Sequence, residues 1–302
     1  MATPAEKQKS SGLGPEYQYD LTELLKVDPA LLHYDESARV PTGMQEPRGV
    51  ALAPDGRLLV AGDRAVRTFD AAGKAAGEFA TEGLPHCLAA GPAGTIFVAM
   101  KDHVETFDTA GKRLAAWESL GQAAYLTGVA AGPEDVFAAD AGARAVVRYD
   151  ASGRTVKRIA GKTDEKGTGG FLIPSPYFDV ALGRDRLVWI VNPGMRRVEC
   201  YTYDGEFRKA WGKASPSIEG FCGCCNPIHI AIAPDGSFVT SEKGLPRVKV
   251  CSPEGALVSV VAPPSAFAAG TSGLDVAVDA AGRIFVLDPR RRAVRVFARK
   301  KG

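Results

Sequence analysis

The chain has 302 residues, of which 45% are hydrophobic and 24% are charged, and its formal net charge is +2. This is the composition of a globular protein, and the near-balanced charge gives no electrostatic reason to expect binding to nucleic acid or to an anionic membrane. No apolar run reaches the length of about 18 residues that a membrane-spanning helix needs. The six cysteines are too few to hold a chain of this length together by disulfides.

The start of the chain, MATPAEKQKSSGLGPEYQYD, lacks the apolar core of a signal peptide. As written, the sequence therefore predicts a cytoplasmic protein, or an exported one if a signal has been trimmed from the N-terminus. We expect residues 1–19 to form a disordered or extended tail. We expect residues 20–302 to form a single domain and the protein to be a monomer.

One pattern recurs from Gly49 onward: an apolar run, a turn with Gly or Asp-Gly, a second apolar run, and then another hairpin. A period of roughly 40 to 50 residues is that of propeller blades. Apolar alternation between turn dipeptides predicts strands. The six copies span residues 49–79, 87–117, 128–159, 179–211, 229–261 and 275–297. The sequence therefore predicts an all-β, six-bladed β-propeller with four-stranded blades.

The sixth copy stops after its third strand. Residues 30–40 precede the first copy and can supply the missing strand, beside the last strand at 293–299. Closure of the ring by an N-terminal strand near 30–40 removes an exposed sheet edge.

The repeat, in the form GVALAPDGRLLVAG…RTFDAAGK at 49–74, resembles the NHL-repeat six-bladed β-propellers over residues 45–297. With FCGCCNP at 221–227 and SEKGLPRVKV at 241–250, the chain is similar to a bacterial subgroup with a GCCNP-type cysteine loop, from which no activity is carried over. Related propellers include RNA-binding modules, lactonase-like hydrolases and a metal-dependent amidating lyase. The resemblance thus implies a fold and does not choose an activity.

Alignment of the copies places one residue of each at the start of the innermost strand. Innermost strands line the central channel, and the loops that lead into them form one face. The six residues are Gly49, Cys87, Gly128, Asp179, His229 and Asp275. Glycine suits a crowded axis, whereas a thiol, an imidazole and carboxylates are costly there unless they are paired or bind a ligand. We expect a polar ring at one mouth of the channel.

The segment before His229 places three cysteines within four residues, above the same mouth. Thiolates suit iron–sulfur clusters, zinc and copper. The sequence predicts an iron–sulfur cluster, most simply of the 4Fe–4S type, with zinc or copper as alternatives. The expected ligands are Cys222, Cys224 and Cys225, with Cys87 or His229 as the fourth. Asp179 and Asp275 would tune the site or bind a second ion. The implied role is redox chemistry or electron transfer, with a redox protein or a small molecule as partner.

Other interpretations stay open, and the sequence leaves undecided whether the chain is an enzyme. In one, His229, Asp179 and Asp275 hold an axial ion for a metal-dependent hydrolase or lyase, and the cysteines are peripheral. In another, the face is a protein-interaction scaffold. Cys222 could also form a disulfide with Cys224 or Cys225, or the thiols could be free.

Three further expectations concern other parts of the chain. Glu242 and Lys243 are expected to form an ion pair at the opposite end of the channel. The insertion at 161–178 is expected to lie on the cysteine face as a lid. Cys200 and Cys251 are expected to be packing residues.

Overall fold

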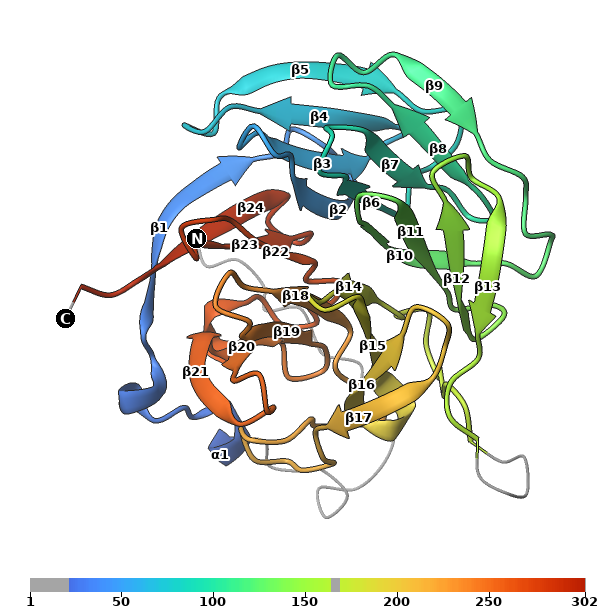
Figure 1. Ribbon diagram of the computed structural model, residues 1–302. Coiled ribbons are helices and arrows are strands. Elements are labelled where there is room, and N and C mark those ends of the chain that lie inside the picture. The colour runs from blue at the N-terminus through green and yellow to red at the C-terminus, as the bar shows by residue number, and fades with distance from the viewer. Residues whose placement is uncertain (1–21, 164–168, 302) are drawn as a thin grey trace, which may run out of the picture.

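The computed structural model describes residues 22–163 and 169–301, which form six four-stranded antiparallel sheets around a central axis (Figure 1). The prediction of an all-β, six-bladed propeller is confirmed. The tail predicted for residues 1–19 lies outside the described residues. The few helical elements are α1 (Thr22–Leu25) and the 3-10 turns η2 (Pro29–Leu31), η3 (Pro193–Met195) and η4 (Pro264–Ala266).

Each blade is a meander that starts at its innermost strand and runs outward along the chain. In blade 6 the outermost strand comes instead from the N-terminal end of the chain. Blade 1 contains β2 (Pro47–Leu52), β3 (Leu58–Gly62), β4 (Ala65–Phe69) and β5 (Ala75–Ala80). Blade 2 contains β6 (Cys87–Ala90), β7 (Ile96–Ala99), β8 (Val104–Phe107) and β9 (Arg113–Ala116). Blade 3 contains β10 (Leu126–Ala131), β11 (Asp135–Asp140), β12 (Ala145–Asp150) and β13 (Thr155–Ile159).

The second half of the ring follows the same order. Blade 4 contains β14 (Val180–Leu182), β15 (Leu187–Asn192), β16 (Arg197–Thr202) and β17 (Phe207–Trp211). Blade 5 contains β18 (His229–Ile232), β19 (Phe238–Glu242), β20 (Arg247–Cys251) and β21 (Leu257–Ala262). Blade 6 contains β22 (Val276–Val278), β23 (Ile284–Asp288), β24 (Ala293–Arg299) and, from the other end of the chain, β1 (Tyr34–Pro41).

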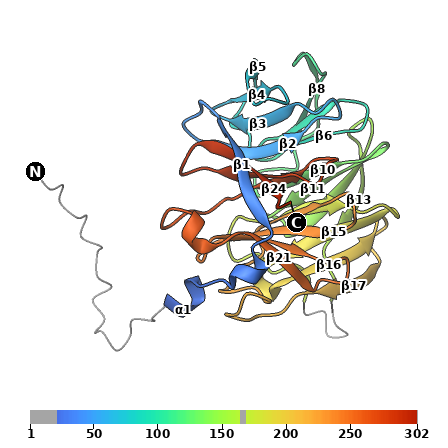
Figure 2. The same ribbon diagram turned by 90° about the vertical axis from the view of Figure 1, so that its left-hand side faces the viewer.

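The ring is closed by β1, as predicted. β1 pairs antiparallel with β24 from Tyr34 opposite Arg299 to Pro41 opposite Ala293, with one irregularity between Glu36 and Ala38. Figure 2 shows β1 running along the outside of the ring. Blade 6 therefore takes strands from both ends of the chain, and β24 is covered on both sides.

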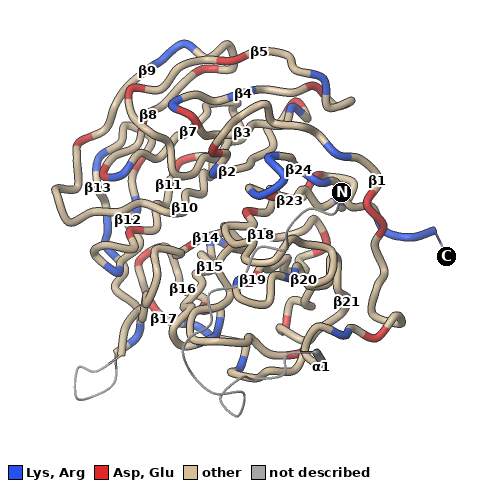
Figure 3. The backbone as a smooth tube through the Cα atoms, turned by 180° about the vertical axis from the view of Figure 1, so that it is seen from behind, with Lys and Arg blue, Asp and Glu red and all other residues tan. Residues whose placement is uncertain are grey.

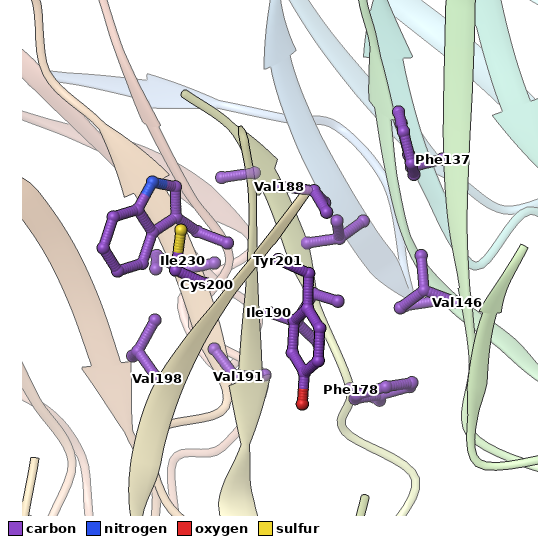
Figure 4. Close-up of a cluster of buried hydrophobic side chains, with 14 of the residues drawn as sticks. Phe137, Val146, Phe178, Val188, Ile190, Val191, Val198, Cys200, Tyr201 and Ile230 are labelled. Atoms are coloured by element: carbon purple, nitrogen blue, oxygen red, sulfur yellow. The ribbon is translucent and has the colours of Figure 1, made fainter. Parts of the chain in front are cut away.

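The hydrophobic core lies between neighbouring blades, because each sheet buries both of its faces. Figure 4 shows this packing around blade 4, where Val188 and Ile190 face Phe137 and Val146 of blade 3, and Cys200 lies on the other side beside Ile230 of blade 5. The same cluster contains two cysteines far from the axis. They are Cys200 and Cys251, which are 0% and 3% exposed, so their predicted packing role is confirmed.

Charged residues of both signs are spread around the ring. In Figure 3, Lys and Arg segments alternate with Asp and Glu segments around the described chain. None of the described helices has the length and apolar character required to cross a membrane.

Candidate functional site at the channel mouth

All six blades contribute residues to a pocket of about 430 Å³ at one end of the axis. Most of these residues belong to the segments that lead into the innermost strands, as the repeat register predicted. The lining residues are Gln45, Glu46, Pro47, Arg48, His86, Tyr125, Thr127, Pro176, Tyr177, His229, Gly270, Ser272, Gly273, Pro289 and Arg290. A concave site with a few convergent polar groups is the usual form of a small-molecule site.

The floor of the pocket contains a buried group of Asp179, His229 and Asp275. His229 Nδ1 lies 3.3 Å from Oδ2 of Asp179 and 3.5 Å from Oδ1 of Asp275. One ligand atom from each of the three residues lies within 4.8 Å of the other two. The three residues are only 7 to 9% exposed.

Both carboxylates also join neighbouring blades. Asp179 Oδ2 accepts a hydrogen bond of 3.0 Å from Ile230 N of blade 5. Asp275 Oδ2 accepts one of 2.8 Å from Val50 N, which connects blade 6 to blade 1. These backbone donors fix the orientation of the carboxylates before any ligand binds.

The electrostatics of the group favour a cation. Burial opposes the charged form of His229, but the two carboxylates outweigh it and raise the pKa of the imidazole. Burial, together with the charge of Asp179, raises the pKa of Asp275 to about 6 despite the opposing effect of His229. Two carboxylates around a single imidazole leave negative charge uncompensated in a buried place, which a bound cation would relieve.

The remaining ring positions make room for this group. A Cβ on Gly128 would lie 2.3 Å from Asp179 Oδ1, so a side chain there would displace the carboxylate. Cys87 is buried, and burial together with the charges of Asp179 and Asp275 raises the pKa of its thiol well above the usual value. Cys87 is therefore a neutral thiol beside the carboxylates rather than a thiolate.

The walls of the pocket are aromatic, and charged residues of both signs line it, since Arg48 pairs with Glu46 at 3.2 Å. His86 packs on Tyr125 with ring centroids 4.7 Å apart, and Tyr177 meets His229 edge-on at 6.0 Å. Arg48 and Arg290 lie on the rim. His86 Nδ1 bonds to the carbonyl of Leu126, and burial lowers the pKa of this histidine, which favours the neutral imidazole.

The cysteine loop packs against the end of β19 at this mouth. Cys222 N donates to Glu242 Oε2 at 3.1 Å, and Asn226 exchanges hydrogen bonds with the backbone of Lys243. The expected location of Glu242 and Lys243 at the opposite end of the channel is therefore wrong. β18 leaves the mouth and β19 returns to it, with His229 opposite Ser241, so the end of β19 lies beside the start of β18.

The expected ion pair between these two residues is also replaced by a different one. Glu242 is 0% exposed and forms ion pairs with Arg247 and Lys249, which are each 1% exposed. Both cations also donate to the carbonyl of Gly220. The buried charges thus anchor the start of the cysteine loop to blade 5.

The three loop cysteines differ in their surroundings. Cys224 is exposed, Cys225 is 6% exposed, and their sulfur atoms lie 3.3 Å apart. Burial alone would raise the pKa of Cys225, but hydrogen bonds from Ser175, Cys224 and Lys243 and the charge of Lys243 outweigh burial and lower it. Lys243 also donates to Ser175 Oγ at 2.8 Å and lies over the Tyr177 ring at 5.0 Å.

Some of the predicted ligands are brought together and others are not. Of the His, Cys, Asp and Glu residues in the described chain, the group with ligand atoms at metal-binding separations is Asp179, His229 and Asp275. Cys222, Cys224, Cys225 and Cys87 do not form such a group, although the electrostatic influence of the axial carboxylates reaches Cys87. The predicted iron–sulfur cluster remains a prediction.

Sequence reasoning missed several pocket residues. Tyr125, Tyr177 and Arg290 were not singled out. Lys243, whose ammonium lies over the Tyr177 ring, was expected at the opposite end of the channel. Tyr125 and Tyr177 stand three and two residues before the axial positions Gly128 and Asp179, and their place in the segments that lead into the innermost strands is the signal that could have found them. The insertion at 161–178 lies at the predicted face and supplies Ser175 and Tyr177, while residues 164–168 lie outside the described part.

Fold and site together define a six-bladed β-propeller with an axial Asp–His–Asp group. No protein-family model matches the chain, and no curated protein matches it by sequence. The chain is similar in structure to virginiamycin B lyase from Staphylococcus aureus, at TM-score 0.58 and 14% identity over 82% of this chain and 80% of the other.

Two further solved structures are similar. A catalytically inactive histidine-to-alanine variant of the S. aureus lyase with quinupristin has TM-score 0.58 and 14% identity over 86% of this chain and 82% of the other. A protein of unknown function from Bacteroides thetaiotaomicron has TM-score 0.64 and 14% identity over 87% of this chain and 71% of the other. At such identity the likeness shows the fold alone, and the likeness to NHL repeats remains one of sequence pattern.

Proposed function

We propose that the chain is a metal-dependent lyase or hydrolase whose reaction centre is the group of Asp179, His229 and Asp275. The observation that carries the proposal is this group of one imidazole and two carboxylates at the floor of a pocket to which all six blades contribute. His229 belongs to both the group and the pocket lining, so it connects the ion to the bound substrate.

The three side chains fit a divalent cation. Charge-assisted hydrogen bonds between buried groups are usually about 2.7 to 2.9 Å long. The separations of 3.3 and 3.5 Å at His229 are longer. They match the spacing of two atoms that coordinate one ion at roughly 2.0 to 2.2 Å each. Nitrogen and carboxylate oxygen donors suit zinc or manganese, and the backbone donors to both carboxylates supply the supporting shell of such a site.

The residues around the ion have definite roles in this proposal. A bound divalent cation would polarise a substrate oxygen or a water molecule. If His229 binds the ion through Nδ1, then Nε2 carries the proton and presents a hydrogen-bond donor, and Nε2 has no hydrogen-bond partner among the residues that the structure describes. Tyr125 and Tyr177 offer apolar walls to the substrate, and Arg48 and Arg290 offer cations at the rim.

The similarity to a lyase supports the choice of reaction class. The S. aureus neighbour loses catalysis when one histidine is replaced by alanine, and that variant was obtained with quinupristin. In this chain, His229 is the histidine held by carboxylates at the axis. Quinupristin is therefore the first substrate to test.

The test compares metal binding and turnover in the wild type and Asp275→Asn. We expect calorimetry with Zn²⁺ or Mn²⁺ to show one site in the wild type, and a weakening of at least about tenfold in the variant, because a charged ligand is lost. Asp279→Asn is the matched control, since Asp279 lies outside the ring in a turn and pairs with Arg283. Equal metal binding by Asp275→Asn and the wild type would contradict the proposal.

Mass spectrometry of the products separates the two reaction types. Products of a lyase sum to the mass of the substrate, whereas a hydrolase adds one water. We expect turnover to stop with a chelator and to return with the metal, and to survive in Cys224→Ser. Turnover that is unchanged by the chelator would reject metal dependence.

A separate measurement distinguishes a redox role of the cysteine loop from catalysis at the axial group. A 4Fe–4S cluster on the cysteines, or zinc or copper there, would make metal content depend on Cys222 and Cys224 rather than on Asp275. Iron analysis and a visible spectrum of anaerobically prepared protein decide between the two sites, because the axial group of oxygen and nitrogen donors gives no sulfur-to-iron absorption.

A further inference from the structure

The proposed reaction centre leaves the most unusual part of the sequence, the cysteine loop, without a role. Cys224 and Cys225 are adjacent in the chain, and their sulfur atoms lie 3.3 Å apart. Cys224 is exposed, whereas Cys225 lies behind it and is 6% exposed. An outer thiol therefore faces solvent, and an inner thiol lies in contact with it.

The inner sulfur has the surroundings of a reactive thiolate. Lys243 Nζ donates to Ser175 Oγ at 2.8 Å, and these two groups together lower the pKa of the Cys225 thiol. Thiolates are stabilised by such neighbours and are the nucleophilic form of cysteine. The packing cysteines Cys200 and Cys251 have no such partners, and burial raises the pKa of each thiol to about 11.

The loop is also held rigidly, so the thiol pair is prearranged. Asn226 Nδ2 donates to the carbonyls of Cys222 and Lys243 at 2.6 and 3.0 Å, and its Oδ1 accepts from Lys243 N at 2.9 Å. Cys222 N is fixed to the buried Glu242. The two sulfurs and the Lys243 ammonium are thus attached to the same end of blade 5.

We propose that Cys224 and Cys225 form a dithiol–disulfide modification site that reacts with low-molecular-weight disulfides. The exposed Cys224 sulfur, as its thiolate after proton loss, attacks a disulfide RSSR, forms a mixed disulfide with one half and releases the other half as RS⁻, which takes up a proton. The Cys225 thiolate then attacks the Cys224 sulfur and releases the second RS⁻. The balance is one dithiol plus RSSR giving one protein disulfide plus two RSH.

The product would be a reversible bond rather than a structural staple. Adjacent cysteines bring their Cα atoms closer than the usual range for disulfides, so the bond is strained. Strained and exposed disulfides are the more easily reduced ones, with labile or regulatory roles. Oxidation would also remove the thiolate beside Lys243, whose ammonium lies over the Tyr177 wall of the pocket. The site can therefore alter the charge next to the proposed reaction centre.

The test treats reduced protein with glutathione disulfide and counts thiols after denaturation. The chain has six cysteines, all of them free thiols in the structure. We expect the wild type to lose two thiols, and the peptide containing Cys224 and Cys225 to lose two hydrogens in mass, reversibly with dithiothreitol. We expect Cys225→Ser to stop at one glutathione adduct on Cys224.

Matched variants distinguish a specific reaction of the Cys224–Cys225 pair from unspecific oxidation of exposed thiols. Cys222→Ser, on the same loop, should still lose two thiols. Lys243→Met should slow the reaction at least several-fold, because less thiolate is present. Lys209→Met should not, since Lys209 makes a comparable contact over the Trp189 ring but lies away from the thiols. Wild-type protein that keeps all its thiols, or that gains stable glutathione adducts without forming the internal disulfide, overturns the proposal.

Discussion

At the scale of single residues, the same side chain behaves differently according to its partners. Cys87, Cys200 and Cys251 are buried, and burial raises the pKa of each thiol, whereas Lys243 and Ser175 lower the pKa of Cys225. These four cysteines therefore divide into three thiols whose pKa is raised by burial and one whose pKa is lowered by its neighbours. This division follows from local charge and hydrogen bonding rather than from spacing along the chain.

The packing thiols make the fold sensitive to alkali. Burial raises the pKa of Cys251 to about 11. In the unfolded chain a thiol ionises near its ordinary value of about 8.5. Between these values the unfolded state binds fewer protons than the folded state, so the free energy of unfolding falls as the pH rises. Between about pH 8 and 10, we expect the free energy of unfolding to fall by about 2 kcal/mol less in Cys251→Ala than in the wild type.

Urea unfolding followed by circular dichroism at both pH values measures this difference. Val250→Ala is the control, because it removes buried apolar atoms next to Cys251 but leaves the thiol. That variant should be less stable than the wild type by a similar amount at both pH values. Equal pH dependence in Cys251→Ala and the wild type would show that this thiol does not contribute.

At the scale of elements, the β18–β19 hairpin positions both candidate sites. β18 begins with His229, and β19 ends with Glu242, directly followed by Lys243, because antiparallel pairing returns the chain to the same mouth. The cysteine loop then attaches to the end of β19 through Glu242 and Asn226. One hairpin therefore carries the axial imidazole on one strand and the support of the thiol pair on the other.

Glu242→Gln tests how much the loop depends on this support. The change leaves Arg247 and Lys249, both 1% exposed, without a carboxylate partner. Removal of one partner from a buried ion pair usually costs about 3 to 5 kcal/mol. Here carbonyl groups still accept from both cations, so we expect a loss of about 3 kcal/mol in the free energy of unfolding. Urea titration measures it.

A surface ion pair provides the control for this change. Glu206 pairs with Arg208 in a setting where both side chains are more than half exposed. Glu206→Gln should cost less than about 1 kcal/mol. If Glu242→Gln is no more destabilising than Glu206→Gln, the buried charges do not anchor the loop.

At the scale of the whole molecule, the repeat in the sequence made the ring predictable. Six copies with alternating apolar residues determine the blade count, and the missing strand in the sixth copy indicates closure by the N-terminal segment. Register within the copies also predicted that Asp179, His229 and Asp275 share one mouth. These features depend on the local apolar pattern and on the symmetry of the ring, and both can be read from a single amino-acid sequence.

What the sequence did not reveal depends on contacts between segments that have no repeat register. The loop at 212–228 has no counterpart in the other copies, so nothing in the pattern indicated that it packs on Glu242. The pairing of Lys243 with Ser175 joins two irregular segments from different blades. Such side-chain contacts determine which cysteines are close together, and periodicity carries no information about them.

Closure of the ring by β1 gives the last prediction. Deletion of residues 1–41 removes the strand that covers β24 and leaves a sheet edge that can pair with other chains. It also removes Glu36, the partner of Arg295, which is only 4% exposed. We expect a loss on the order of several kcal/mol in the free energy of unfolding, since each backbone hydrogen bond contributes about 1 kcal/mol. Calorimetry should show a lower and broader transition, and light scattering should show larger species.

Deletion of residues 1–21 is the matched control, because it keeps all of β1. This shorter deletion should melt like the full chain. A synthetic peptide of residues 30–41 should bind the larger deletion and restore its transition, because strand addition to an open sheet edge replaces the lost ladder, which ends at Pro41 opposite Ala293. If the larger deletion melts as cooperatively as the control, then β1 does not close the ring in solution, and neighbouring blades alone hold the axial group together.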